Sequence, residues 1–309
     1  MKILAIGAAG FLGSIVVAEL VERKAHVLVA DFKDKADNLP AGVEYRHLDV
    51  MDFTGVRTVM EEAKPEVVIN LAGLLTGLCA REPYKATQVN VMGMANVLEA
   101  SRFTGVKRVV LSSSAGVTAP ERIDTREEAK ISPDVTMYGA TKFYDEILGR
   151  EYHRNYGIEV ACLRYSLIYG PGEVATPGNA LRLKTIESCV LGNDIHIDDA
   201  TGEDRAHLLN VYDAAHATVL AATATTAVNG VFNISGMPED FLSFQEVVDV
   251  LHEAFPGSGK VLFTGKKAPQ EFGLYFHDKA RRAFGFVPTI SARNGLIANA
   301  KQRLEKIQK

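Results

Sequence analysis

A tyrosine and a lysine stand four residues apart in the segment YGATK, residues 138–142, and could act together as an acid/base pair. A free phenol has a pKa of about 10, so proton transfer near neutral pH needs roughly 4 kcal/mol of preferential stabilisation of the phenolate. If residues 138–154 form a helix, positions i and i+4 share a face, and the Lys142 ammonium lies beside the Tyr138 phenol and lowers its pKa. Apolar residues at helical spacing and a closing Gly157 support that helix.

A glycine-rich turn at the start of the chain predicts a binding site for a dinucleotide. Residues 2–6 form a short apolar run, and the segment GAAGFLG places Gly7, Gly10 and Gly13 directly after it. Such glycines let the backbone turn tightly and approach a pyrophosphate, whose charge is met by the N-terminal amides of the following helix. We expect that helix over residues 11–22.

The run HVLVAD, residues 26–31, indicates a second strand that ends in an acid. At this position the dinucleotide fold places a carboxylate for the adenosine ribose hydroxyls, and a carboxylate there repels a 2′-phosphate. Asp31 therefore favours NAD over NADP as the cofactor. Lys33 and Lys35 stand close enough in the sequence to accommodate that phosphate, so NADP stays the less favoured alternative.

Apolar strand patterns alternate with helix patterns through the first half of the chain. Strands are expected over residues 43–49, 66–73 and 106–114, and helices near 53–63 and 87–103. This alternation implies parallel βαβ units, and the order predicts an α/β fold with a doubly wound parallel sheet of the Rossmann type. The carboxyl ends of such strands build the site, and the strand over 106–114 brings three consecutive serines to that edge.

Composition and charge exclude several classes of protein. The chain has 309 residues, 47% of them hydrophobic and 23% charged, with a formal net charge of -4 and no basic run. We therefore expect a small-molecule substrate as partner, and neither nucleic acid nor a membrane. The cysteines at positions 79, 162 and 189 lack disulfide or metal spacing, so we expect buried thiols, a reducing compartment and no metal site. The apolar N-terminus is too short to cross a bilayer, which favours a cytoplasmic location.

Several short motifs together carry a family resemblance. GAAGFLG, Asp31, NLAG, REPYKATQVNVMG, SSSAGV, YGATK, LRYSLIYGPG and DKARRAFGFVP follow one another along almost the whole chain. In order and spacing they resemble the extended short-chain dehydrogenase/reductase family, also called the NAD-dependent epimerase/dehydratase family. The resemblance implies that Tyr138 is the acid/base and that Lys142 lowers its pKa and holds the nicotinamide ribose. It also implies that Ser114 hydrogen-bonds the reacting oxygen, with Ser113 as the alternative serine.

The expected site has a cofactor part and a substrate part. Contacts with NAD are expected from the glycine turn, the strand ends, the helix near 87–103 and the acid/base pair, at Gly7, Gly10, Phe11, Leu12, Gly13, Asp31, Asp49, Val50, Leu71, Ala72, Gly73, Asn90, Ser112, Tyr138, Lys142 and Tyr165. Contacts with substrate are expected from Leu75, Thr76, Ser113, Ser114, Arg182 and Arg205. A lone histidine such as His207 is more often structural than a proton carrier.

Departures from the subfamily patterns bear on the substrate. Sugar-nucleotide 4,6-dehydratases of the resembling family carry Asp-Glu directly after the catalytic threonine, where this chain has Ala115 and Gly116, so dehydration is not expected. UDP-galactose 4-epimerases usually carry RYFN, where this chain has RYSL and Leu167 replaces the asparagine expected near the nucleotide sugar. The acid expected to bind the UDP ribose has no clear counterpart between Lys266 and Tyr275.

One segment favours a nucleotide substrate. GEDRAHLLNVYDAA resembles the family's RDFIHVDD, which places Arg205 where a phosphate-binding arginine would lie. The alternative for Arg205 is a salt bridge to Glu203 or Asp213.

These observations leave three hypotheses for function. The first is an NAD(H)-dependent oxidoreductase that interconverts a secondary alcohol and a ketone on a small polar substrate resembling a sugar, a polyol or a hydroxy acid. The second is an NAD-dependent sugar-nucleotide epimerase, similar to UDP-galactose 4-epimerase, which oxidises its substrate only transiently. The third is a protein that binds NAD as a sensor without turnover. A pure sensor does not need an acid/base group, so the presence of Ser114, Tyr138 and Lys142 argues against this hypothesis.

Two domains and a dimer are also expected. The dinucleotide-binding domain covers residues 1–165 with a return segment at 207–235, and the smaller substrate-binding domain covers 166–206 and 236–309. Dimers built from the helices near 87–103 and 138–154 are common in the resembling family, so we expect a homodimer.

Overall fold

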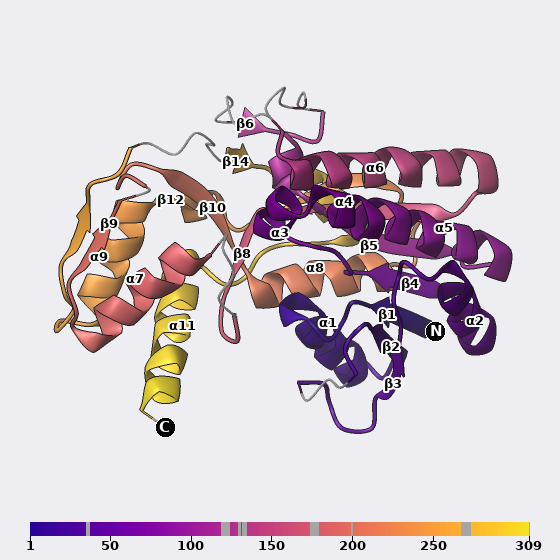
Figure 1. Ribbon diagram of the computed structural model, residues 1–309, viewed down its shortest axis with the longest axis horizontal. Helices are drawn as coiled ribbons and strands as arrows, with labels where there is room; N and C mark the ends of the chain where they lie inside the picture. Colours follow the sequence, from indigo (N-terminus) through magenta and orange to yellow (C-terminus); the bar gives the residue numbers. More distant parts are fainter. Residues whose placement is uncertain are drawn as a thin grey trace.

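A parallel sheet forms the larger part of the computed structural model, which describes residues 1–34, 38–118, 124–128, 131, 135–173, 179–198, 200–266 and 273–308 (Figure 1). Seven strands of the described chain pair in the order β11-β7-β5-β4-β1-β2-β3, and all of these pairs are parallel. Their bounds are β1 Lys2–Ile6, β2 His26–Asp31, β3 Glu44–His47, β4 Val67–Asn70, β5 Arg108–Ser114, β7 Glu159–Tyr165 and β11 Gly230–Ile234.

The strand order makes the sheet doubly wound, as the sequence predicted. From β1 the chain runs outward to β2 and β3, and then crosses back to β4 and continues to the opposite edge. The connections therefore diverge between β1 and β4, and a crevice opens at the carboxyl ends of these two strands.

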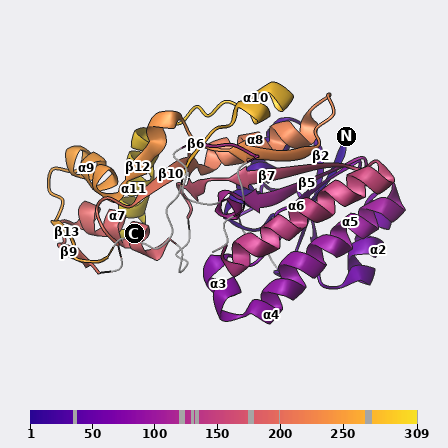
Figure 2. The same ribbon diagram turned by 90° about the horizontal axis from the view of Figure 1, so that it is seen from above.

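Helices cover both faces of the sheet (Figures 1 and 2). The helices α1 Phe11–Glu22 and α8 Val211–Thr223 pack on one face, and α2 Phe53–Ala63, α5 Gly93–Thr104 and α6 Met137–Tyr156 pack on the other. The two bounds expected for the first helix are confirmed, as are those of the helix near 53–63. Helix α6 begins where the Thr136 hydroxyl accepts a hydrogen bond from the Gly139 amide, 3.1 Å long, and ends at Gly157, whose φ is 73°.

The helix expected near 87–103 is divided. Its first part is a π-helical turn, Thr87–Met92, which α5 continues, and two short helices, α3 Thr76–Arg81 and α4 Pro83–Ala86, precede it. A π-turn inserts one extra residue per turn and re-aims the side chains after it, so a periodicity of 3.6 cannot predict it.

Among the described residues, three smaller sheets and the helices α7 Ala180–Leu191, α9 Phe244–Ala254 and α11 Ala292–Ile307 lie outside the large sheet. Strands β8 Leu167–Tyr169, β10 Arg205–Asn210 and β12 Phe241–Ser243 form one sheet, β9 Ile195–Ile197 pairs with β13 Val261–Phe263, and β6 Asp124–Thr125 pairs with β14 Leu274–Tyr275. The three helices share a separate apolar core with the first of these sheets. The division into two domains stays a prediction.

Two segments pack against elements that are distant in the sequence. Residues 207–210 belong to β10 and pair with β8 and β12, so the chain returns to the large sheet only at α8. Helix α10, Asp278–Phe284, packs against β11, where the Phe284 and Phe232 rings meet edge to face at 5.2 Å. Apolar burial against β11 therefore attaches α10 to the core of the large sheet.

The prediction of buried thiols is confirmed, since Cys79, Cys162 and Cys189 are buried free cysteines. Within the described ranges, none of the helices combines the length and apolar character that a membrane span requires.

Candidate active site

The glycine turn lies at the crevice between β1 and β4. Gly7 has a φ of +71°, and a Cβ on it would lie 2.4 Å from the amide nitrogen of Ala72, so this turn is pressed against the end of β4. A Cβ on Gly13 would lie 2.4 Å from the Cα of Ala8, so helix α1 packs closely on the turn. Gly10 differs, because a Cβ there meets only the Gly7 carbonyl oxygen, at 3.5 Å. The open backbone at Gly10 and the amides of α1 fit a pyrophosphate.

The buried Asp31 carboxylate is fixed at the end of β2. One of its oxygens accepts a hydrogen bond from the Ala9 amide (2.9 Å) and the other from the Lys33 amide (3.2 Å). The Lys33 ammonium donates to the Ala9 carbonyl oxygen at 3.3 Å. Asp31 thus stands beside the glycine turn, where an adenosine ribose is expected, and Lys33 is close to it; Lys35 lies outside the described residues.

The remaining predicted cofactor residues follow strand ends or lie behind them. Asp49 lies two residues beyond β3, and one of its carboxylate oxygens accepts a hydrogen bond from the Met51 amide (2.9 Å). Val50 is buried, and its side chain faces Gly93. Leu71, Ala72 and Gly73 directly follow β4.

Tyr165 ends β7 inside the core. Its hydroxyl is hydrogen-bonded to the Thr218 hydroxyl at 2.7 Å. The phenol is buried and its polar atom is engaged with α8, so its expected contact with NAD stays a prediction.

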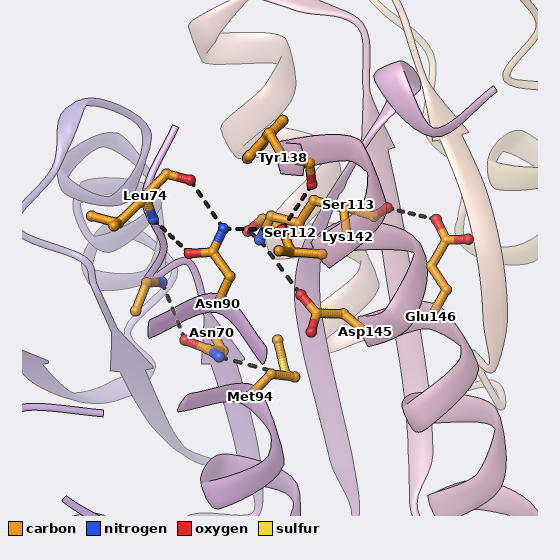
Figure 3. Close-up of polar contacts among 12 residues, drawn as sticks. Asn70, Leu74, Asn90, Met94, Ser112, Ser113, Tyr138, Lys142, Asp145 and Glu146 are labelled. Carbon is orange, nitrogen blue, oxygen red and sulfur yellow. Dashed lines mark hydrogen bonds and ion pairs between the residues drawn. The ribbon is translucent and has the colours of Figure 1, made fainter. Parts of the chain in front are cut away.

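Asn90 connects three elements around the crevice (Figure 3). It lies on the π-turn, and its amide oxygen accepts a hydrogen bond from the Leu74 amide (2.7 Å). Its amide nitrogen donates to the Leu74 carbonyl oxygen and to the Thr141 hydroxyl of α6, both at 3.1 Å. Asn90 therefore holds the loop after β4 against α6, a role that the sequence did not indicate.

The three predicted catalytic residues meet at the end of β5 and the first turn of α6. Ser114 hydrogen-bonds Tyr138, and its hydroxyl oxygen accepts a bond from the Gly116 amide at 3.1 Å. The Lys142 ammonium lies 3.4 Å from the Ser112 hydroxyl and 5.9 Å from the centre of the Tyr138 ring (Figure 3). Its other close partner is Asp145, whose carboxylate is 3.8 Å away.

The Tyr138 phenol does not show the lowered pKa that its spacing from Lys142 predicted. Burial raises its pKa well above the ordinary value of 10, the Cys79 and Asp145 charges raise it further, and the hydrogen bond from Ser114 lowers it only in part. Removal of water disfavours the phenolate. The Asp145 carboxylate also offsets part of the positive field that the Lys142 ammonium exerts on Tyr138. Tyr138 therefore holds its proton at neutral pH in this environment.

Ser113 points away from Tyr138, because successive strand residues face opposite sides. Its hydroxyl donates to Glu146 Oε1 at 2.5 Å (Figure 3). Glu146 also accepts two hydrogen bonds from the Arg164 guanidinium, each 2.7 Å long, and all three side chains are buried. Since this network engages Ser113, we propose Ser114 as the serine that holds the reacting oxygen.

The predicted substrate residues do not all come together. Leu75 and Thr76 are exposed at the start of α3, beside the crevice. Arg182 is buried and ion-paired with Glu173. Arg205 pairs with Glu246 at 3.1 Å, and not with the partners suggested by the sequence.

His207 and Asp213 have structural roles. The His207 ring is buried, with one nitrogen 2.8 Å from the Met237 carbonyl oxygen and the other accepting from the Tyr275 amide at 3.1 Å. Burial lowers the pKa of His207 to about 4, so the ring is neutral at pH 7. The Asp213 carboxylate accepts hydrogen bonds from the amides of Thr289 and Ile290, both at 3.0 Å.

A doubly wound sheet, a glycine turn at its switch point and a Tyr-Lys pair beside a strand-end serine define a dinucleotide-dependent oxidoreductase class. Sequence comparison leads to the same class, since the NAD dependent epimerase/dehydratase family matches residues 3–235. The chain belongs to this family. It is an NAD-dependent enzyme of the extended short-chain dehydrogenase/reductase type.

Several similar proteins match nearly the whole chain. A putative UDP-glucose 4-epimerase of Methanocaldococcus jannaschii is 27% identical over 306 residues, which cover 95% of each protein. The UDP-glucose 4-epimerase of Thermotoga maritima, crystallised with UDP-glucose, superposes with a TM-score of 0.90 at 25% identity and covers 99% of this chain and 100% of that one. The Thermus thermophilus UDP-glucose 4-epimerase in complex with NAD gives a TM-score of 0.86 at 25% identity, with 98% of both chains covered.

The two glycines of the turn should respond differently to an added methyl group. Gly13→Ala is expected to lower the free energy of unfolding by about 1–3 kcal/mol, because its Cβ would overlap the Ala8 backbone. Gly10→Ala is expected to fold with near wild-type stability and to bind NAD more weakly, because its Cβ enters the space proposed for the pyrophosphate. Urea unfolding and calorimetric titration with NAD measure the two effects. Equal NAD affinity in Gly10→Ala and wild type would contradict this placement.

The charge on Asp31 should set the preference between the two dinucleotides. Asp31→Asn keeps an acceptor for the Ala9 amide but removes the negative charge, so NADP binding should improve relative to NAD by about tenfold, roughly 1.4 kcal/mol. Asp34→Asn is the matched control, since its exposed side chain carries the same charge. Unchanged selectivity in Asp31→Asn would show that Asp31 does not face the ribose.

Proposed function

We propose that this enzyme is a 4-epimerase of nucleotide-linked sugars, with a UDP-sugar as substrate. The observation that carries the proposal is the convergence of Ser114, Tyr138 and Lys142 on one edge of a fold that is similar over its full length to UDP-glucose 4-epimerases. Epimerisation at a secondary carbinol needs one group that removes the hydroxyl proton and later returns it. Tyr138 is the titratable group placed for that task, because its phenol is hydrogen-bonded to Ser114 and lies near the Lys142 ammonium, whose charge favours the phenolate that the first step needs.

Each residue of the site would have its own role in the proposed epimerisation. Tyr138 takes the proton from the 4-hydroxyl of the sugar, and Ser114 donates a hydrogen bond that fixes this oxygen as it becomes a carbonyl. Lys142 supplies the positive charge that favours the phenolate over the phenol, and Ser112 holds the ammonium in place. Bound NAD would supply the acceptor that takes the hydride from C4 and gives it back. Tyr138 then returns the proton to the oxygen, so no net oxidation results.

Net oxidation of an alcohol is the second candidate, and three positions favour it. Leu167 begins β8 where epimerases of the family usually carry asparagine. The two arginines expected to contact substrate, Arg182 and Arg205, are both paired with carboxylates of the chain. A substrate without a nucleotide would leave these ion pairs undisturbed.

Product analysis separates the two candidates. The purified protein with NAD is expected to invert C4 of at least one of UDP-glucose, UDP-N-acetylglucosamine and UDP-glucuronic acid, as followed by proton NMR, with no growth of NADH absorbance. Steady NADH formation from sugar acids, polyols or hydroxy acids, without inversion of any UDP-sugar, would replace the epimerase by the dehydrogenase. Bound NAD with no turnover on either panel would indicate the sensor.

Tyr138→Phe tests the acid/base assignment within the same assays. The variant keeps the ring and its packing but has no proton to exchange, so turnover should fall roughly 10²- to 10⁴-fold while NAD affinity and the unfolding midpoint stay close to wild type. A rate near that of the wild type would refute the role of Tyr138.

We also propose that the enzyme is a homodimer that pairs through α5 and α6. These helices leave the large side chains of Phe103, Tyr144 and Tyr156 exposed on one side of the large sheet, and Met92, directly before α5, is exposed as well. Apolar surface gathered on adjacent helices is typical of a protein interface.

Sedimentation measures this assembly directly. The wild type is expected at twice the chain mass of 33.5 kDa, and Tyr144→Glu should shift the equilibrium toward the monomer because it buries a charge in the interface. Leu191→Glu is the control, since Leu191 is equally exposed but lies on α7. A monomeric wild type, or equal dissociation of both variants, would contradict the proposed face.

A further inference from the structure

Asp145 is a carboxylate in an unusual environment. The residue is fully buried on α6, one turn after Lys142, and neither of its carboxylate oxygens has a hydrogen-bond partner among the described residues. Buried carboxylates in native proteins are normally hydrogen-bonded or paired, so an exception calls for a physical reason. The Lys142 ammonium, 3.8 Å away, is close enough for charge interaction but beyond hydrogen-bond distance (Figure 3).

The groups around Asp145 pull its proton equilibrium in opposite directions. On its own helix, Lys142 favours the carboxylate and Glu146 disfavours it. The Asp145 charge also acts on the Cys162 thiol of β7, and the Lys142 charge acts on the Cys79 thiol of α3. The Asp145 charge also raises the pKa of Tyr138, which lies on the same helix. Burial is the largest effect and raises the pKa of Asp145 to about 7.

Resting on the function proposed above, we propose that Asp145 is a positioning residue that holds the Lys142 ammonium and, through its own ionisation, sets the pH at which Tyr138 gives up its proton. The geometry orders the three groups along one face of α6 at positions i, i+4 and i+7, with Lys142 in the middle. Lys142 is thus shared between an acid that it must activate and a carboxylate that competes for it.

The two protonation states of Asp145 have different consequences. Ionised Asp145 offsets the field of Lys142 at Tyr138 and makes the phenolate harder to form. When Asp145 takes up a proton, the full ammonium charge acts on Tyr138 and the phenolate becomes easier to form. Each half of this exchange moves one proton between the Asp145 carboxylate and solvent, with no other bond made or broken.

The first measurement is the pH profile of kcat/KM in Asp145→Asn. This variant keeps the shape of the side chain but removes its charge, so the apparent pKa of the group that must be unprotonated should fall by about one pH unit. Glu151→Gln is the matched control, because it removes the same charge from a more exposed position on the same helix. A profile of Asp145→Asn that coincides with that of the wild type, or a uniform loss of rate at every pH, would assign Asp145 a purely structural role.

The second measurement needs no substrate and so separates this inference from the proposed function. A carboxyl whose pKa is about 7 in the folded protein and 3.8 unfolded costs stability as the pH rises between these values. The urea midpoint of the wild type should therefore decline relative to that of Asp145→Asn between about pH 5 and about pH 8. Midpoints that run parallel over this range would overturn the inference even if epimerase activity is found. If no UDP-sugar is converted and the midpoints diverge, Asp145 titrates as inferred and only the function is refuted.

Discussion

The site depends on the close approach of two backbones, the first turn of α6 and the turn that follows β5. A Cβ on Gly139 would lie 2.6 Å from the carbonyl oxygen of Gly116, so only glycine permits this contact. The contact brings Tyr138 within hydrogen-bond reach of Ser114. A catalytic hydrogen bond tolerates changes of only a few tenths of an ångström in the distance between its two oxygens. A contact between two backbones, with no flexible side chain between them, is a suitable way to hold that distance constant.

The same contact sets the rotation of α6 against β5. Different side chains of the helix therefore contact different serines of the strand. Lys142 faces Ser112, whereas Glu146, one turn later, faces Ser113 and Arg164. Helix α6 thus carries two groups of buried charges. The group around Glu146 is hydrogen-bonded throughout, whereas in the group around Lys142 the Asp145 carboxylate has no hydrogen-bond partner among the described residues. The paired system around Glu146 gives rigidity, and the incompletely paired system around Lys142 leaves a charge free to act on a neighbour.

The sequence predicted much of the fold because its signals are local. The glycines at 7, 10 and 13, the helix over 11–22 and the acid at the end of β2 each follow from residues within one turn or strand. The interactions that it could not predict join distant segments. Arg205 of β10 pairs with Glu246 of α9, and α10 returns to β11 through apolar contacts.

The chemistry of the site was predicted less completely than its position. Spacing alone places Tyr138 and Lys142 on one helix face, but the pKa of a phenol depends on how much water reaches it and on every charge nearby. Burial reversed the expected direction for Tyr138, and Asp145, which contributes to that reversal, has no distinguishing feature in the sequence. The π-turn at Thr87–Met92 was not predicted either, because its extra residue does not follow from a helical period of 3.6.

Asn90 makes the wall of the crevice a rigid one. Both hydrogens of its amide are engaged, one by the loop after β4 and one by Thr141 of the catalytic helix. Lifting that loop would leave buried polar atoms without partners, at a cost of about 1–3 kcal/mol for each. The loop that carries Leu75 and Thr76 is therefore unsuited to act as a lid.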